Sequence, residues 1–241
     1  MIVKSLPFDN LIPLLLVSTW FQKITCEVIL PLLLNSSLNN FQEQIESHFK
    51  KGIWMPLALR RKISDRARNQ IILKMACKYC ISSEITNCVN YGADVCNTPD
   101  ETYGHYPIHT VCTQGTDKNC VEVLFRLLDA GAYKNPYTEV SPLTMLCPGI
   151  YAKYNIEMLH LLLAYGICVN GTNSVVTPLY TTLKSYNSPS KMTPIINLLL
   201  DYNADVDVYD ITIAINYNYD DFLILRLIEY EELTRLRVKI K

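Results

Sequence analysis

Glycine is scarce in this chain, and the sequence also lacks features that would indicate catalysis or nucleic-acid binding. Only 8 of the 241 residues are glycine, so the glycine-rich loops that cradle phosphate groups have little to be built from. The formal net charge is −1, which gives no overall positive field to hold a nucleic acid backbone. No Ser/His/Asp set or catalytic carboxylate pair stands out. We therefore expect no enzyme, no cofactor, no nucleic-acid partner and no small-molecule substrate.

Long hydrophobic runs are absent as well. The uncharged run from Leu11 to Gln22 covers 12 residues, whereas a helix needs about 20 residues to cross a bilayer. Lys4 before this run loosely imitates a secretory signal, but no small-residue cleavage site follows. We expect no membrane span and favour a buried helix over a signal or anchor, which places the protein in the cytoplasm or nucleus.

A short pattern recurs about every 35 residues. It reads Tyr106-Pro107-Ile108-His109, Ser141-Pro142-Leu143-Thr144 and Thr177-Pro178-Leu179-Tyr180. A second series of turn positions lags behind it, at Gly92, Gly131, Gly166 and Asn203. Two features that share one period indicate a single supersecondary unit repeated in tandem.

Each part of the pattern has a physical reason. The Ser141 or Thr177 side chain can accept a hydrogen bond from a backbone N–H at the start of a helix. Proline at the first helical position gives up an N–H that has no partner there anyway. Glycine suits the left-handed turn that ends a helix. The unit is therefore a pair of helices, with Pro107, Pro142 and Pro178 opening the first and Gly92, Gly131 and Gly166 closing the second.

These sequence motifs and their spacing resemble the ankyrin repeat family, whose repeat of about 33 residues is a turn plus two helices with a T-P-L-H opening. The resemblance implies an all-α ankyrin repeat solenoid with about four repeats and a weak terminal repeat. We assign residues 1–66 to a helical extension or cap, 67–230 to the repeats and 231–241 to a basic tail. In the extension, apolar residues fall at helical spacing at Phe41, Ile45 and Phe49.

Nine cysteines and four histidines raise the question of a metal. Cys77, Cys112 and Cys147 lie 35 residues apart, in a slot where the family places a small residue. Free cysteine behaves as a small buried hydrophobe. Cys77 and Cys80 form a CxxC pair, but no second pair or zinc-like histidine spacing follows. We expect no metal and free thiols. His109 stands at the position of the histidine in the T-P-L-H motif. The resemblance implies a structural, hydrogen-bonding role for it.

The resemblance also implies a function: a non-catalytic scaffold or adaptor that binds another protein through its finger turns and concave inner helices. Tyrosine is enriched in binding hot spots, so Tyr103 and Tyr137 are the first candidates. The full set of expected partner-binding residues lies at the finger turns: Asp100, Glu101, Tyr103, Lys134, Tyr137, Glu139 and Asn173. A substrate-recognition subunit of a cullin-type ubiquitin ligase is the alternative, although no recruiting box is recognisable after Asp207.

Overall fold

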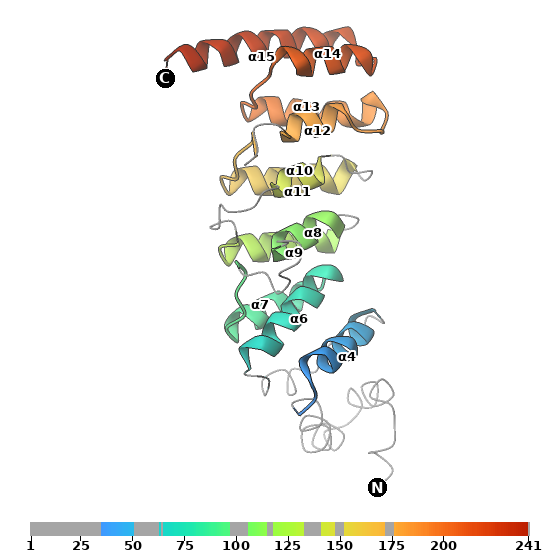
Figure 1. Ribbon diagram of the computed structural model, residues 1–241, viewed down its shortest axis with the longest axis vertical. Coiled ribbons are helices and arrows are strands. Elements are labelled where there is room, and N and C mark those ends of the chain that lie inside the picture. The colour runs from blue at the N-terminus through green and yellow to red at the C-terminus, as the bar shows by residue number, and fades with distance from the viewer. Residues whose placement is uncertain are drawn as a thin grey trace. The chain divides into compact units, whose positions relative to one another are not determined.

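The structure of this chain is a computed structural model, and it describes residues 35–50, 63, 65–96, 106–114, 118–132, 141–147, 152–171 and 176–240. Every regular element in these ranges is a helix (Figure 1). The predicted all-α class is therefore confirmed. The helices are α4 (Leu38–Lys50), α6 (Arg66–Lys78), α7 (Ser82–Asn90), α8 (Pro107–Gln114), α9 (Lys118–Asp129), α10 (Pro142–Leu146), α11 (Ala152–Ala164), α12 (Pro178–Leu183), α13 (Pro189–Asp201), α14 (Val208–Asn216) and α15 (Asp221–Ile240).

The chain divides into two compact units, Met1–Thr110 and Val111–Lys241, with the boundary inside α8. The predicted divisions after residues 66 and 230 stay predictions, and most of the predicted extension lies outside the described residues. The last of these divisions falls within a continuous element, because α15 runs from Asp221 to Ile240.

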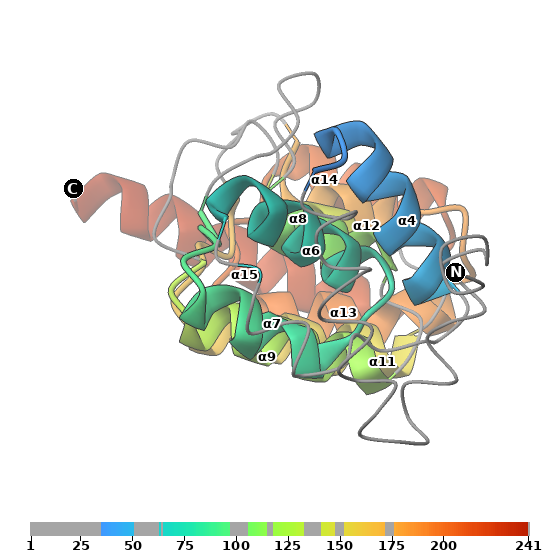
Figure 2. The ribbon, with the colours of Figure 1, turned by 90° about the horizontal axis from the view of Figure 1, so that it is seen from below.

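In the first unit, α4 packs against α6, and Figures 1 and 2 both show the two helices side by side. Phe41, Ile45 and Phe49 are buried, as their four-residue spacing along one helix face predicts. Arg68 of α6 donates a hydrogen bond to the Ser36 carbonyl oxygen (3.0 Å). Its guanidinium also lies 5.6 Å from the centre of the Phe41 ring. α4 thus covers an apolar face of α6.

A polar contact at the edge of the same interface fixes α4 along α6. The Glu46 carboxylate accepts hydrogen bonds from Lys78 and from the Tyr79 hydroxyl, the latter at 3.0 Å. The hydrogen bond from Lys78 lowers the pKa of Glu46. Because these side chains remain partly exposed, the contact orients α4 more than it stabilises it.

In the second unit the helices form two rows. In one row, the short helix α12 contacts α10 and α14. In the other row, α11 contacts α9 and α13. Each short helix is joined to the long helix that follows it, in the pairs α10–α11, α12–α13 and α14–α15. Buried leucines and isoleucines supply the core between the rows: Leu124, Leu127, Leu143, Leu159, Leu162, Leu179, Ile195, Leu199, Leu223 and Leu227.

The short helices begin as the repeated pattern predicts. Pro142 and Pro178 stand at the first helical positions of α10 and α12. The Ser141 hydroxyl oxygen accepts a hydrogen bond from the Leu143 N–H (3.3 Å). The Thr177 hydroxyl oxygen accepts one from the Tyr180 N–H (3.0 Å). α14 begins differently, with a reciprocal capping box between Asp207 and Asp210.

The long helices end in a shared backbone motif. At the end of α11 the Gly166 N–H donates to the Leu163 carbonyl oxygen (3.0 Å), and the Ile167 N–H donates to that of Leu162 (3.1 Å). Gly166 has a φ of 82°, which is the left-handed conformation of a Schellman cap. The same pair of bonds follows each residue of the lagging series: Gly92, Gly131, Gly166 and Asn203.

We expect Gly166→Ala to lower the free energy of unfolding by about 1 kcal/mol, because a side chain disfavours this backbone conformation. A methyl group at Gly166 would meet no atom within 4 Å, so backbone strain is the main cost. The converse change, Asn203→Gly, relieves the same strain at a φ of 63° and should not destabilise the protein. Urea unfolding of both variants measures the effect, and an undiminished stability of Gly166→Ala would argue against strain at this turn.

Candidate protein-binding surface

The residues predicted to bind a partner cannot be placed in the fold. Asp100, Glu101, Tyr103, Lys134, Tyr137, Glu139 and Asn173 all lie outside the described residues. Their role at the finger turns stays a prediction.

The residues predicted to shape the repeats are placed, and they lie where the pattern puts them. The three prolines, Pro107, Pro142 and Pro178, each begin a helix, and the three glycines, Gly92, Gly131 and Gly166, each have positive φ after one. His109 is buried, with its ring 5.7 Å from that of Tyr106. Its backbone N–H donates to the Tyr106 carbonyl oxygen (2.9 Å).

The cysteines of the repeated slot are buried. Cys77, Cys112 and Cys147 are free thiols inside the protein. Burial raises the pKa of Cys147 to about 12, so its thiol stays protonated and unreactive at neutral pH. Cys80 and Cys120 are each disulfide-bonded, so the expectation of free thiols is wrong at these two positions.

A cluster of aromatic and basic side chains lies on neighbouring short helices of the second unit. Tyr180 of α12 and Tyr209 of α14 stack with their ring centres 6.1 Å apart and their planes 19° from parallel. Lys184, just after α12, donates a hydrogen bond to the Tyr180 hydroxyl (2.8 Å). Its ammonium group lies 5.1 Å from the centre of the Tyr180 ring. We call Tyr180, Lys184, Tyr209 and Tyr217 the tyrosine–lysine cluster.

The cluster is accessible and positively charged at its centre. Tyr209 is 57% exposed, Tyr217 is 38% exposed, and Lys184 is exposed. The hydrogen bond to Tyr180 raises the pKa of Lys184, and the neighbouring tyrosines act in the same direction. Tyr186, which follows in the α12–α13 turn, is fully exposed. The surface therefore offers aromatic area together with one persistent cation.

Local structure holds these side chains in position. The Thr177 cap fixes the start of α12, seven residues before Lys184, and the Asp207–Asp210 capping box fixes the start of α14 around Tyr209. Tyr219, buried in the α14–α15 turn, donates through its hydroxyl to the Thr182 and Leu183 carbonyl oxygens, both at 3.4 Å. These bonds tie the end of α14 to the end of α12. The stacked rings thus belong to a framework that is already ordered.

The sequence pattern did not single out this cluster. Tyr180 is the last residue of the third copy of the repeated pattern, and Tyr209 lies in the predicted weak terminal repeat. One signal was available, because Tyr180 and Lys184 are four residues apart and share a helix face. The pairing of Tyr180 with Tyr209, 29 residues later, depends on how α12 and α14 pack.

Other kinds of site are not indicated within the described ranges. There, no three His, Cys, Asp or Glu side chains gather closely enough to hold a metal ion. No helix in the described part of the chain has the length and apolar character needed to cross a membrane. Comparison of the chain with protein-family models and with curated proteins gives no match.

Proposed function

We propose that this protein is a non-catalytic scaffold or adaptor of the ankyrin repeat kind, and that it binds another protein through its short helices and the adjoining turns. The observation that carries the proposal is the exposed tyrosine–lysine cluster on two successive short helices. The repeated proline starts and Schellman ends support the repeat assignment, because they recur with one period along the chain.

The composition of the cluster suits protein recognition. Tyrosine supplies a large rigid contact area at low conformational cost and keeps a hydroxyl for hydrogen bonding. Tyr180 and Lys184 are already held by their mutual hydrogen bond, so less side-chain entropy is lost when a partner binds. The cluster would form the centre of the contact with the partner.

Affinity capture from cell lysate with the full chain and its variants tests this proposal. We expect Tyr209→Ala to reduce recovery of the principal partner about tenfold or more, the loss typical of a binding hot spot. Tyr137→Ala tests the predicted finger in the same experiment. Phe125→Ala, which truncates an exposed aromatic residue on α9, serves as the matched control.

Mass spectrometry and thermal melting decide between the outcomes. A partner that is lost with Tyr209→Ala but kept with Phe125→Ala, at unchanged melting temperatures, supports the proposal. Equal recovery by all variants contradicts the assignment of the cluster. Recovery of a cullin with its elongin or Skp1-type adaptor would favour the ubiquitin-ligase alternative.

A further inference from the structure

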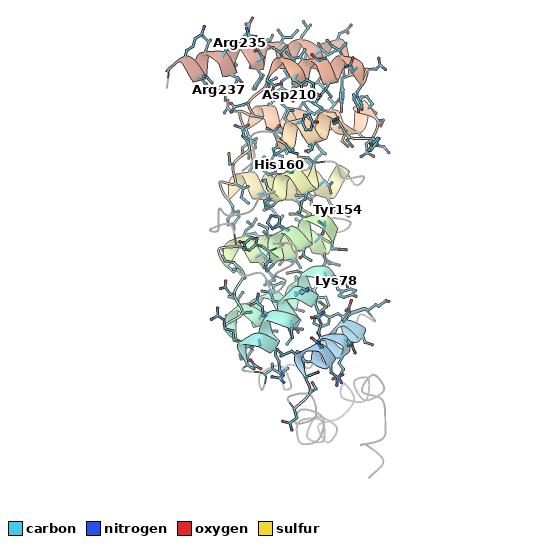
Figure 3. All side chains as sticks on the ribbon, viewed as in Figure 1. Lys78, Tyr154, His160, Asp210, Arg235 and Arg237 are labelled. Atoms are coloured by element: carbon cyan, nitrogen blue, oxygen red, sulfur yellow. The ribbon has the colours of Figure 1, made fainter. Side chains whose placement is uncertain are left out.

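The last helix has apolar side chains on its exposed side as well as on its buried side. Leu223 and Leu227 of α15 are buried, while Phe222 is 75% exposed and Leu225 is 61% exposed. Figure 1 shows α14 and α15 as the end layer of the second unit, and Figure 3 shows side chains projecting outward from it. Exposed apolar side chains gathered on one helix are candidates for an interaction site. The exposed apolar residues of α15 are Phe222, Leu225, Ile228, Leu233, Leu236 and Val238.

Two carboxylates lie among these exposed apolar residues of α15, which we call the apolar stripe. Glu229 and Glu232 are exposed and fall between Ile228 and Leu233 on the same side of the helix. Within the described residues, neither glutamate forms an ion pair. Two of the basic side chains further along α15 do have partners, since Arg235 pairs with Glu231 and Arg237 with Asp205. The centre of the stripe therefore keeps a net negative charge.

We propose that this surface, the α15 face (Phe222, Leu225, Ile228, Glu229, Glu232 and Leu233), docks an amphipathic helix of another protein whose apolar stripe is flanked by lysine or arginine. Exposed apolar residues at helical spacing along a straight helix fit the ridge of a second helix. A partner that covers the face must also meet the charge of Glu229 and Glu232, because a carboxylate removed from water without a cation is costly.

The same charge argues against a second copy of this chain as the occupant. In a two-fold contact between two α15 helices, the middle of one face meets the middle of the other. Glu229 and Glu232 would then lie against the same residues of the second copy, and like charges at an interface are repulsive. A basic helix satisfies both the apolar stripe and its acidic centre.

Two synthetic helical peptides test the proposal by fluorescence anisotropy with the full chain. Both are about 18 residues long and carry leucine at three- and four-residue spacing; one has lysine at the flanking positions and the other has glutamate. We expect the basic peptide to bind roughly tenfold more tightly than the acidic one. The double variant Glu229→Lys with Glu232→Lys should reverse that preference.

Matched controls separate the α15 face from general charge effects. Glu43→Lys with Glu157→Lys makes the same charge change at exposed positions on α4 and α11 and should leave the preference for the basic peptide intact. Leu225→Ser should weaken binding of the basic peptide roughly tenfold, whereas Phe125→Ser on α9 should not. Circular dichroism checks that each variant is folded.

Three results would overturn the proposal. The first is equal binding of the two peptides, and the second is a preference that survives charge reversal at Glu229 and Glu232. The third is a concentration-dependent dimer of the unmodified chain in sedimentation velocity that Leu225→Ser abolishes, which would assign the face to a second copy. Each result is independent of the tyrosine–lysine cluster, so the scaffold proposal can stand or fall separately.

Discussion

Leu162→Asp is expected to destabilise the second unit by about 4 kcal/mol or more, enough to unfold it near physiological temperature. Leu162 is completely buried in α11, which packs between α9 and α13. The substitution removes a large apolar side chain and places a carboxylate where no cation or water can meet it. Because α11 contacts both α9 and α13, the loss at α11 affects both of these interfaces.

Ala164→Asp provides the matched control, because Ala164 is exposed two residues later on the same helix. The new carboxylate stays in water there, and its unfavourable position at a helix C-terminus costs less than about 1 kcal/mol. Thermal melting followed by circular dichroism compares the two variants with the parent protein. If Leu162→Asp melts at the parent temperature, the burial of α11 is wrong.

The ends of the helices could be predicted from the sequence because the determinants are local. Pro178 and Thr177 act on the same helix turn in which they stand. At the end of α11, the Gly166 N–H bonds to the carbonyl three residues before it, and the Ile167 N–H bonds to the carbonyl five residues before it. Such interactions depend on residues that are neighbours in the chain, so a repeated sequence motif is enough to predict the helix ends.

The tyrosine–lysine cluster and the length of α15 were not predictable in this way. The stacking of Tyr180 on Tyr209 requires the packing of α12 against α14, which no local pattern specifies. The repeat pattern predicts that the repeats end at residue 230 and that a basic tail follows, whereas α15 continues to Ile240. No glycine or proline interrupts residues 221–240, and the Glu231–Arg235 ion pair supports the added turns.

The second large effect is expected at Asp210, a buried carboxylate in the capping box of α14. Its oxygen accepts a hydrogen bond from the Asp207 N–H (3.1 Å), and its own N–H donates to the Asp207 side chain (2.8 Å). Burial raises the pKa of Asp210 from 3.8 to about 6, partly offset by the hydrogen bond from Asp207. The folded protein therefore binds this proton more tightly than the unfolded chain does.

The sign of the pH dependence follows from that difference. Because the pKa of Asp210 is higher in the folded state, its contribution to stability is lost as pH rises through about 6 and is fully present only below about 3.8. When the pH is lowered from 7.5 to 5, protonation of Asp210 alone should increase the free energy of unfolding by about 1.4 kcal/mol. Urea unfolding at a series of pH values measures the change.

Asp210→Asn should remove this pH dependence and stabilise the protein by about 1–3 kcal/mol at pH 7.5. The amide oxygen of asparagine can still accept the hydrogen bond from Asp207, so the capping geometry survives while the charge that burial penalises is gone. Asp129→Asn removes the same charge from an exposed position on α9 and should keep the slope of the parent protein. If Asp210→Asn instead loses stability at pH 7.5, or retains the parent slope, the buried carboxylate is not the source of the pH dependence of stability. A loss of stability would mean that the Asp210 charge itself holds the start of α14, and with it the position of Tyr209 in the cluster.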